Sequence, residues 1–169
     1  MKKLKQKFSF LMGIILHLPL LLLAYILQDM IFVELDIFGA KPLILPLAAV
    51  AVAMFEGSTR GGIFGLIAGI VCDASLGQPA VMFTILLTVC GIAVGLLGEQ
   101  LLARGFPSYL LCSAGCLILC TLFQALGHVT PGIASLATLV MTGLIQVVYS
   151  LLFTVLIYLP ARALFHAAA

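Results

Sequence analysis

The chain has 169 residues, of which 64% are hydrophobic and only 8% are charged, and its net charge is +2. A water-soluble domain carries about 25% charged residues, so this composition excludes a soluble globular protein. The apolar runs are long and continuous rather than alternating, which excludes a transmembrane β-barrel and leaves a bundle of membrane helices.

The first apolar segment covers residues 8–33 and follows four lysines within the first seven residues. This order is typical of an uncleaved signal anchor, because no small-residue cleavage site follows the apolar stretch. At 1.5 Å per residue the segment gives about 39 Å of helix, which is enough to cross a membrane with tilt.

Two shorter apolar segments follow, at residues 43–55 and 61–73. Each gives about 20 Å of helix, less than the ~30 Å thickness of a hydrocarbon core. We therefore expect two short helices joined by a loop from Glu56 to Arg60. They either cross the membrane where neighbours shield them or form a re-entrant pair.

Three further spans are predicted at residues 81–102, 108–126 and 134–159, and the last of them ends at Pro160. The chain therefore predicts a single all-α transmembrane domain over residues 1–169. We expect a bundle of about six transmembrane helices, two of them short, without a soluble domain.

The basic residues divide unevenly between the two sides of such a bundle. With the N-terminus in the cytoplasm, the outer loops hold only Lys41. Cytoplasmic loops are enriched in Lys and Arg, so we expect both termini in the cytoplasm. The basic residues on the inner side are Lys2, Lys3, Lys5, Lys7, Arg60, Arg104 and Arg162.

Glycines at four-residue spacing form the sharpest local pattern. Gly61, Gly65 and Gly69 line one helix face, and Gly91 and Gly95 repeat the spacing in the next span. A face without side chains lets another helix approach closely, which is how helices associate in lipid. This face either packs inside the chain or docks a different protein.

Charged residues stand at both ends of the glycine segment. Asp73 lies one turn after the last glycine. It either caps the following turn through the amides of Ser75 or Gly77, or anchors a partner helix or a polar ligand. Glu56 and Arg60 are four residues apart and predict an exposed ion pair at the inner surface, with partner contact as a secondary role.

The sequence carries no pattern typical of catalysis or metal binding. The histidines are far apart, and no Walker loop, zinc-protease motif or nucleophile elbow occurs. The five cysteines lie in apolar runs without a C-x-x-C pair. We expect a protein that is not an enzyme, that has no cofactor or metal, and that binds no nucleic acid.

Residues 46–100 combine four features in a fixed order. An apolar run is followed by the loop at 56–60, then by the glycine segment that ends in Asp73, and then by a small-residue turn that leads into another apolar helix. These features resemble those of the bacterial rod shape-determining protein MreD family. The size, the number of spans and the basic N-terminus also fit that family.

The resemblance implies a component of the cell-elongation machinery in the bacterial cytoplasmic (inner) membrane. Members of this family bind the membrane-anchored periplasmic protein MreC and help to organise lateral peptidoglycan synthesis with other elongation proteins. The resemblance further implies a partner-binding site and secondary loop contacts. The site residues are Gly61, Gly65, Gly69 and Asp73, and the loop contacts are Glu56 and Arg60.

A second interpretation follows from the architecture that this resemblance implies. The MreD family resembles the six-helix substrate-capture subunits of energy-coupling-factor vitamin transporters. In that interpretation the chain is a vitamin-binding membrane subunit, and polar residues line a pocket open to the outer side. These residues are Gln28, Asp29, Asp73, Gln124 and His128.

Overall fold

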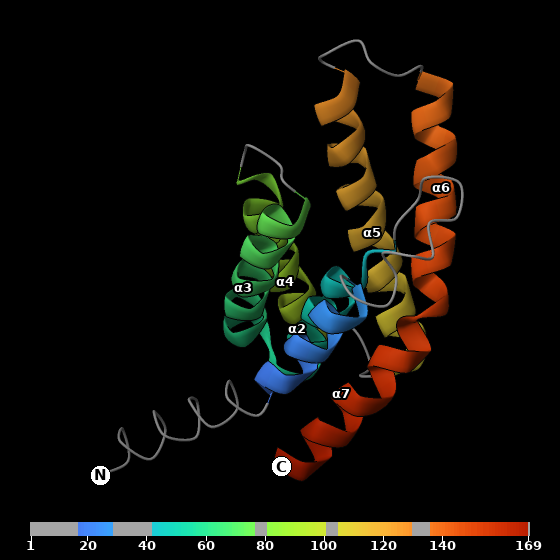
Figure 1. Cartoon of the computed structure of the whole chain (residues 1–169). Coiled ribbons are helices and arrows are strands. Elements are labelled where there is room, and N and C mark those ends of the chain that lie inside the picture. Colours follow the sequence, from blue (N-terminus) through green and yellow to red (C-terminus); the bar gives the residue numbers. More distant parts are fainter. Residues whose placement is uncertain (1–16, 29–41, 77–80, 101–104, 130–135, 169) are drawn as a thin grey trace.

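The computed structural model describes residues 17–28, 42–76, 81–100, 105–129 and 136–168, and its regular elements in these ranges are all helices. The prediction of an all-helical chain is confirmed for this part of it. An N-terminal helix lies at His17–Ile26. It is followed by α2 at Ile44–Glu56, α3 at Ser58–Leu76, α4 at Met82–Gln100, α5 at Phe106–Val129, α6 at Leu136–Leu152 and α7 at Thr154–Ala168 (Figure 1).

The outer surface of the bundle is apolar. Three helical stretches, at Met82–Gln100, Phe106–Ala125 and Val140–Ala163, are long and apolar enough to cross a membrane. Large apolar side chains also point outward, as at Ile85 and Leu111, which are 66% and 70% exposed. Water does not stabilise such a surface, whereas lipid does. The chain is a membrane protein, as its composition predicts.

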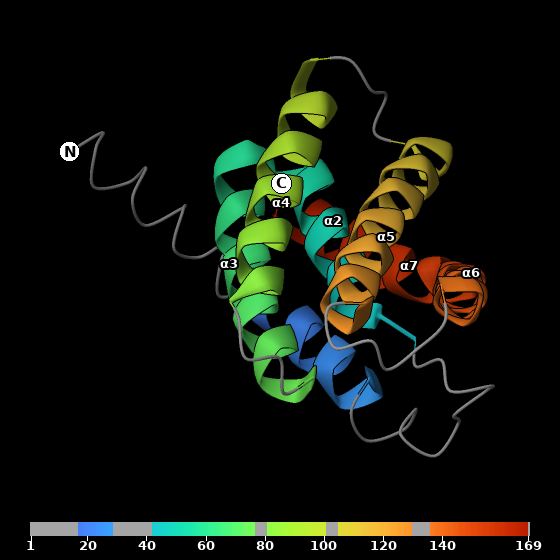
Figure 2. The same ribbon diagram turned by 90° about the horizontal axis from the view of Figure 1, so that it is seen from above.

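Helix α2 lies at the centre of the bundle. Its residues from Ile44 to Phe55 are all buried, and it packs against α3, α4, α5 and α7 (Figure 1, Figure 2). The Tyr109 hydroxyl of α5 donates a hydrogen bond to the Leu47 carbonyl at 3.1 Å. Because other helices surround α2, its length of about 20 Å does not have to match the ~30 Å hydrocarbon core. The prediction of a short helix is confirmed here.

The second helix that the sequence predicts to be short is not short. Helix α3 has 19 residues, because it begins at Ser58 and ends at Leu76 instead of covering 61–73. This gives about 28 Å, close to the thickness of a hydrocarbon core. Only Gly57 separates α3 from α2, so the predicted loop at 56–60 is wrong. Gly57 has a φ of 92°, a left-handed conformation that glycine adopts without steric cost.

The last predicted span, at 134–159, divides into α6 and α7 at Phe153. The Phe153 N–H donates to the Ser150 carbonyl at 3.0 Å, three residues back instead of four. The Thr154 hydroxyl donates to the Leu151 carbonyl, and such back-bonding often bends a helix. The division therefore has a local cause in the backbone and in Thr154.

Helix α7 continues through Pro160 to Ala168, so the predicted end at Pro160 is wrong. A proline removes one backbone donor from a helix, and in a bundle the neighbouring turns can continue beyond it. Tyr158 and Ala161 are buried on either side of Pro160 and hold both turns against the core.

Helices α3 and α4 pack more closely than side chains would permit. A Cβ atom added to Gly65 would lie 2.2 Å from the Leu87 carbonyl oxygen, and one added to Gly69 would lie 2.3 Å from Thr84 Cα. One added to Gly61 would lie 2.6 Å from the carbonyl oxygen of Gly91. The two helices run antiparallel, because residues later in α3 contact residues earlier in α4.

The glycine face predicted from the sequence is therefore filled by the chain's own helix α4, which is the internal-packing alternative. Helix α4 contributes glycines to the same contact. A Cβ atom on Gly91 would lie 2.2 Å from the Gly61 carbonyl oxygen, and one on Gly95 would lie 2.3 Å from Ser58 Cα. The partner-binding interpretation of Gly61, Gly65 and Gly69 is corrected accordingly, because no room remains for another helix on this face.

Alanine substitutions at Gly65 and Gly115 should change stability in opposite directions. At Gly65 the new Cβ atom meets the backbone of α4, and the helices must separate at a cost of about 1–3 kcal/mol. Gly115 in α5 has open space at its Cβ position, so alanine there gains up to about 1 kcal/mol of helix propensity. Thermal unfolding of both variants in detergent measures the difference. Equal effects at the two positions would contradict the close packing.

Candidate functional site

Asp73 joins the end of α3 to the beginning of α4. Its carboxylate accepts hydrogen bonds from the N–H groups of Phe83 at 3.0 Å and Thr84 at 2.9 Å, and from the Thr84 hydroxyl at 2.7 Å. The first N–H groups of a helix have no partner within it, so Asp73 serves as an N-terminal cap supplied by a neighbouring helix. The sequence predicts a capping carboxylate but places its donors in the following turn, whereas these donors lie in α4.

Glu99 makes the reciprocal contact at the other end of the pair. Its Oε1 atom accepts hydrogen bonds from the Ser58 N–H at 2.9 Å and from the Ser58 hydroxyl at 3.4 Å. Ser58 is the first residue of α3, so Glu99 caps α3 as Asp73 caps α4. A Cβ atom on Gly57 would lie 2.2 Å from the same oxygen, so glycine at this position also leaves space for the cap.

Both helices thus carry two glycines and then an acidic residue at four-residue spacing, and each acidic residue caps the other helix. The residues are Gly65, Gly69 and Asp73 in α3, and Gly91, Gly95 and Glu99 in α4. Sequence reasoning identifies the glycines of both helices but misses the role of Glu99. The repeated spacing is the signal that points to it.

His17, Glu56 and Arg60 form a polar cluster where the N-terminal helix, α2 and α3 meet. Glu56 forms an ion pair with Arg60, as the sequence predicts, and its other carboxylate oxygen lies 3.7 Å from His17 Nε2. The predicted exposure is wrong, because the Glu56 side chain is only 5% exposed and that of Arg60 21%. His17 is buried, and its ring packs edge-on against Phe64.

Two polar side chains satisfy the N-terminus of α2 inside the bundle. Gln28 Oε1 accepts hydrogen bonds from the N–H groups of Ile44 and Leu45, both at 3.0 Å. Ser150 Oγ accepts one from the Leu43 N–H at 2.9 Å. A buried N–H group without an acceptor costs about 1–3 kcal/mol, so these two side chains stabilise a helix end that water does not reach.

Three of the residues predicted to line an outer vitamin pocket, Gln28, Asp73 and Gln124, lie in the ranges that the structure describes. Gln28 and Asp73 bind the N-termini of two different helices. The hollow beside Gln124 has a volume of about 10 Å³, which is at the lower limit for one water molecule. Asp29 and the side chain of His128 lie outside the described residues.

The five cysteines are buried as thiols within the bundle. Within the described ranges, no three His, Cys, Asp or Glu side chains are grouped so that they could hold a metal ion. Small thiols of this kind fill space between helices.

The described interactions bring Gly61, Gly65, Gly69 and Asp73 together inside the α3–α4 pair, and Glu56 and Arg60 together at the junction with α2. No family model, curated protein or solved structure matches this chain.

Removing the Asp73 carboxylate should destabilise the bundle by about 2 kcal/mol, the upper end of the range for a helix cap. Thr84→Val removes only one hydrogen bond to that carboxylate and should cost about 1 kcal/mol. The double variant Asp73→Ala/Thr84→Val should cost less than the sum, because both changes remove the same bond. Unfolding of the three variants in detergent gives the coupling, and additive losses would contradict the shared bond.

Arg60→Met should cost more than the ~1 kcal/mol of an exposed ion pair, because it leaves the Glu56 charge buried. Breaking a fully buried ion pair costs about 3–5 kcal/mol. Because Arg60 is partly exposed, we expect Arg60→Met to cost less than this. Glu56→Gln in the same chain removes the buried charge and should recover part of the loss. A double variant no more stable than Arg60→Met would show that the charge of Glu56 is solvated in another way.

Proposed function

We propose that this chain is a membrane component of the bacterial cell-elongation machinery. In this proposal it binds an MreC-like, membrane-anchored periplasmic protein and helps to organise lateral peptidoglycan synthesis. The chain has no catalytic role in the proposal and acts by holding its partners in the membrane.

The observation that supports this proposal concerns the segment that resembles the MreD family, because its residues form one unit of three packed helices. Residues 46–100 contain most of α2 and all of α3 and α4. Each feature of the resemblance has a physical role in this three-helix unit. The glycines permit the α3–α4 contact, Asp73 caps α4, and Glu56 pairs with Arg60 at the junction of α2 with α3.

The positive-inside pattern orients this unit in the proposal. With both termini in the cytoplasm, Glu56, Arg60 and Glu99 lie at the cytoplasmic end of the unit, and Asp73 lies at the periplasmic end. The end of α3 and the beginning of α4, joined by Asp73, then face the compartment in which an MreC-like partner has its soluble part.

The partner does not bind the glycine face in this proposal, because α4 covers it. The outer face of α4 is available instead. Ile85, Val89, Ile92 and Leu96 protrude from it at helical spacing and are 66%, 59%, 42% and 44% exposed. We assign the partner's membrane helix to this face, which belongs to the same unit that carries the resemblance.

Co-purification with an MreC-like protein tests the proposal. The full chain, co-expressed with such a partner and purified in mild detergent, should retain it. Val89→Trp adds bulk to the outer face of α4 and should reduce the retained partner several-fold. Val148→Trp is the matched control, because Val148 of α6 is similarly exposed at 62% and lies outside the unit.

Thermal unfolding of both tryptophan variants shows whether each one still folds. Failure of the wild-type chain to retain the partner would contradict the proposal. Saturable binding of a vitamin to the purified chain would then favour the vitamin-transport interpretation.

A further inference from the structure

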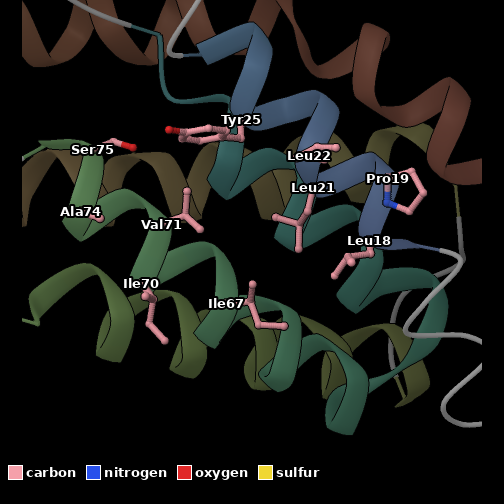
Figure 3. Close-up of a pocket in the computed structure, with 10 residues that line it drawn as sticks. All are labelled: Leu18, Pro19, Leu21, Leu22, Tyr25, Ile67, Ile70, Val71, Ala74 and Ser75. Carbon is pink, nitrogen blue, oxygen red and sulfur yellow. The ribbon is translucent and has the colours of Figure 1, made fainter.

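A groove runs between the N-terminal helix and α3 on the outside of the bundle (Figure 3). Its volume is about 670 Å³, and most of its lining is apolar. Leu22 on one wall and Ile70 on the other are 60% and 51% exposed, so the groove is open to the surroundings of the bundle. In a membrane protein such a surface faces hydrocarbon.

The two ends of the groove differ in polarity. Tyr25 and Ser75 place their hydroxyl groups at one end, as Figure 3 shows. This is the end of α3 that carries Asp73. Toward the other end, beyond Leu18, His17 packs edge-on against Phe64, so the N-terminal helix meets α3 there. The groove therefore has one polar end and an apolar length that stops where the two helices touch.

The length of the groove matches one leaflet rather than the whole membrane. Along α3 it runs from Ile67 to Ser75. This is about 12 Å at 1.5 Å per residue, less than half of the ~30 Å hydrocarbon core. A transmembrane helix of another protein crosses both leaflets and would run past the closed end. An acyl chain of a single leaflet fits the apolar length and leaves its polar end beside the hydroxyls.

We propose that this groove binds one glycerophospholipid from the leaflet on the Asp73 side. Its acyl chain lies between Leu22 and Ile70, and its ester or headgroup oxygens lie beside Tyr25 and Ser75. Tyrosine suits this depth, because its ring is apolar and its hydroxyl binds polar groups at the membrane interface. The lipid joins the N-terminal helix to α3 along the stretch where the two helices are apart. This proposal does not rest on the function proposed above.

Native mass spectrometry of the full chain tests the binding of this lipid. After purification and washing with delipidating detergent, the wild-type chain should retain one phospholipid. Ile70→Trp fills the groove and should lose it, whereas Val148→Trp adds the same side chain outside the groove and should keep it. A wild-type chain without lipid, or an Ile70→Trp chain that keeps it, would overturn the proposal.

Photo-crosslinking identifies the occupant without depending on the stability of a bulky variant. With p-benzoylphenylalanine in place of Leu22, irradiation in native membranes should add the mass of a phospholipid to the chain. An adduct with another protein, or with a second copy of this chain, would overturn the proposal. Tyr25→Phe keeps the ring and removes the hydroxyl, and it should lower lipid retention several-fold in the mass spectrometry assay.

Discussion

The close approach of α3 to α4 is the contact on which the rest of the structure depends. In lipid no hydrophobic force drives helices together, so they associate through dispersion, hydrogen bonds and weak Cα–H···O contacts. All of these require short distances, and glycine at Gly65 and Gly91 permits them. The same closeness brings each carboxylate within reach of the other helix, so that Asp73 and Glu99 bind the first turns of α4 and α3.

Capping by distant residues extends this principle to α2. A helix that begins inside a membrane bundle has N–H groups that water does not reach, and each one needs an acceptor from the protein. Gln28 and Ser150 supply these acceptors to α2 from two segments that are far apart in sequence. Each cap therefore satisfies a helix end and joins two parts of the chain. The N-terminus of α2 is therefore held both by Gln28, at the end of the N-terminal helix, and by Ser150 of α6.

Composition and glycine spacing were sufficient to predict membrane helices and a side-chain-free face, because both follow from burial in lipid. What covers that face was not predictable, since a helix of the same chain and a helix of another protein need the same small residues. The start of α3 was misplaced because Gly57 turns the chain in one residue and the Ser58 cap comes from Glu99, far along the sequence. The predicted end of the last span at Pro160 is wrong for a related reason. Tertiary packing outweighs the loss of one backbone N–H donor, so α7 continues through the proline.

The residues on which the proposed link to the MreD family rests serve the packing of α2, α3 and α4, so they bear on the fold before they bear on a partner. A protein that used this unit for another purpose would need the same glycines and the same Asp73. Recognition then depends on exposed side chains, which include those of the groove beside α3 and those of the outer face of α4. The groove beside α3 ends within one leaflet, whereas the outer face of α4 continues from Ile85 to Leu96. A lipid in the groove and a partner helix on α4 therefore occupy different faces, and either assignment can fail without affecting the other.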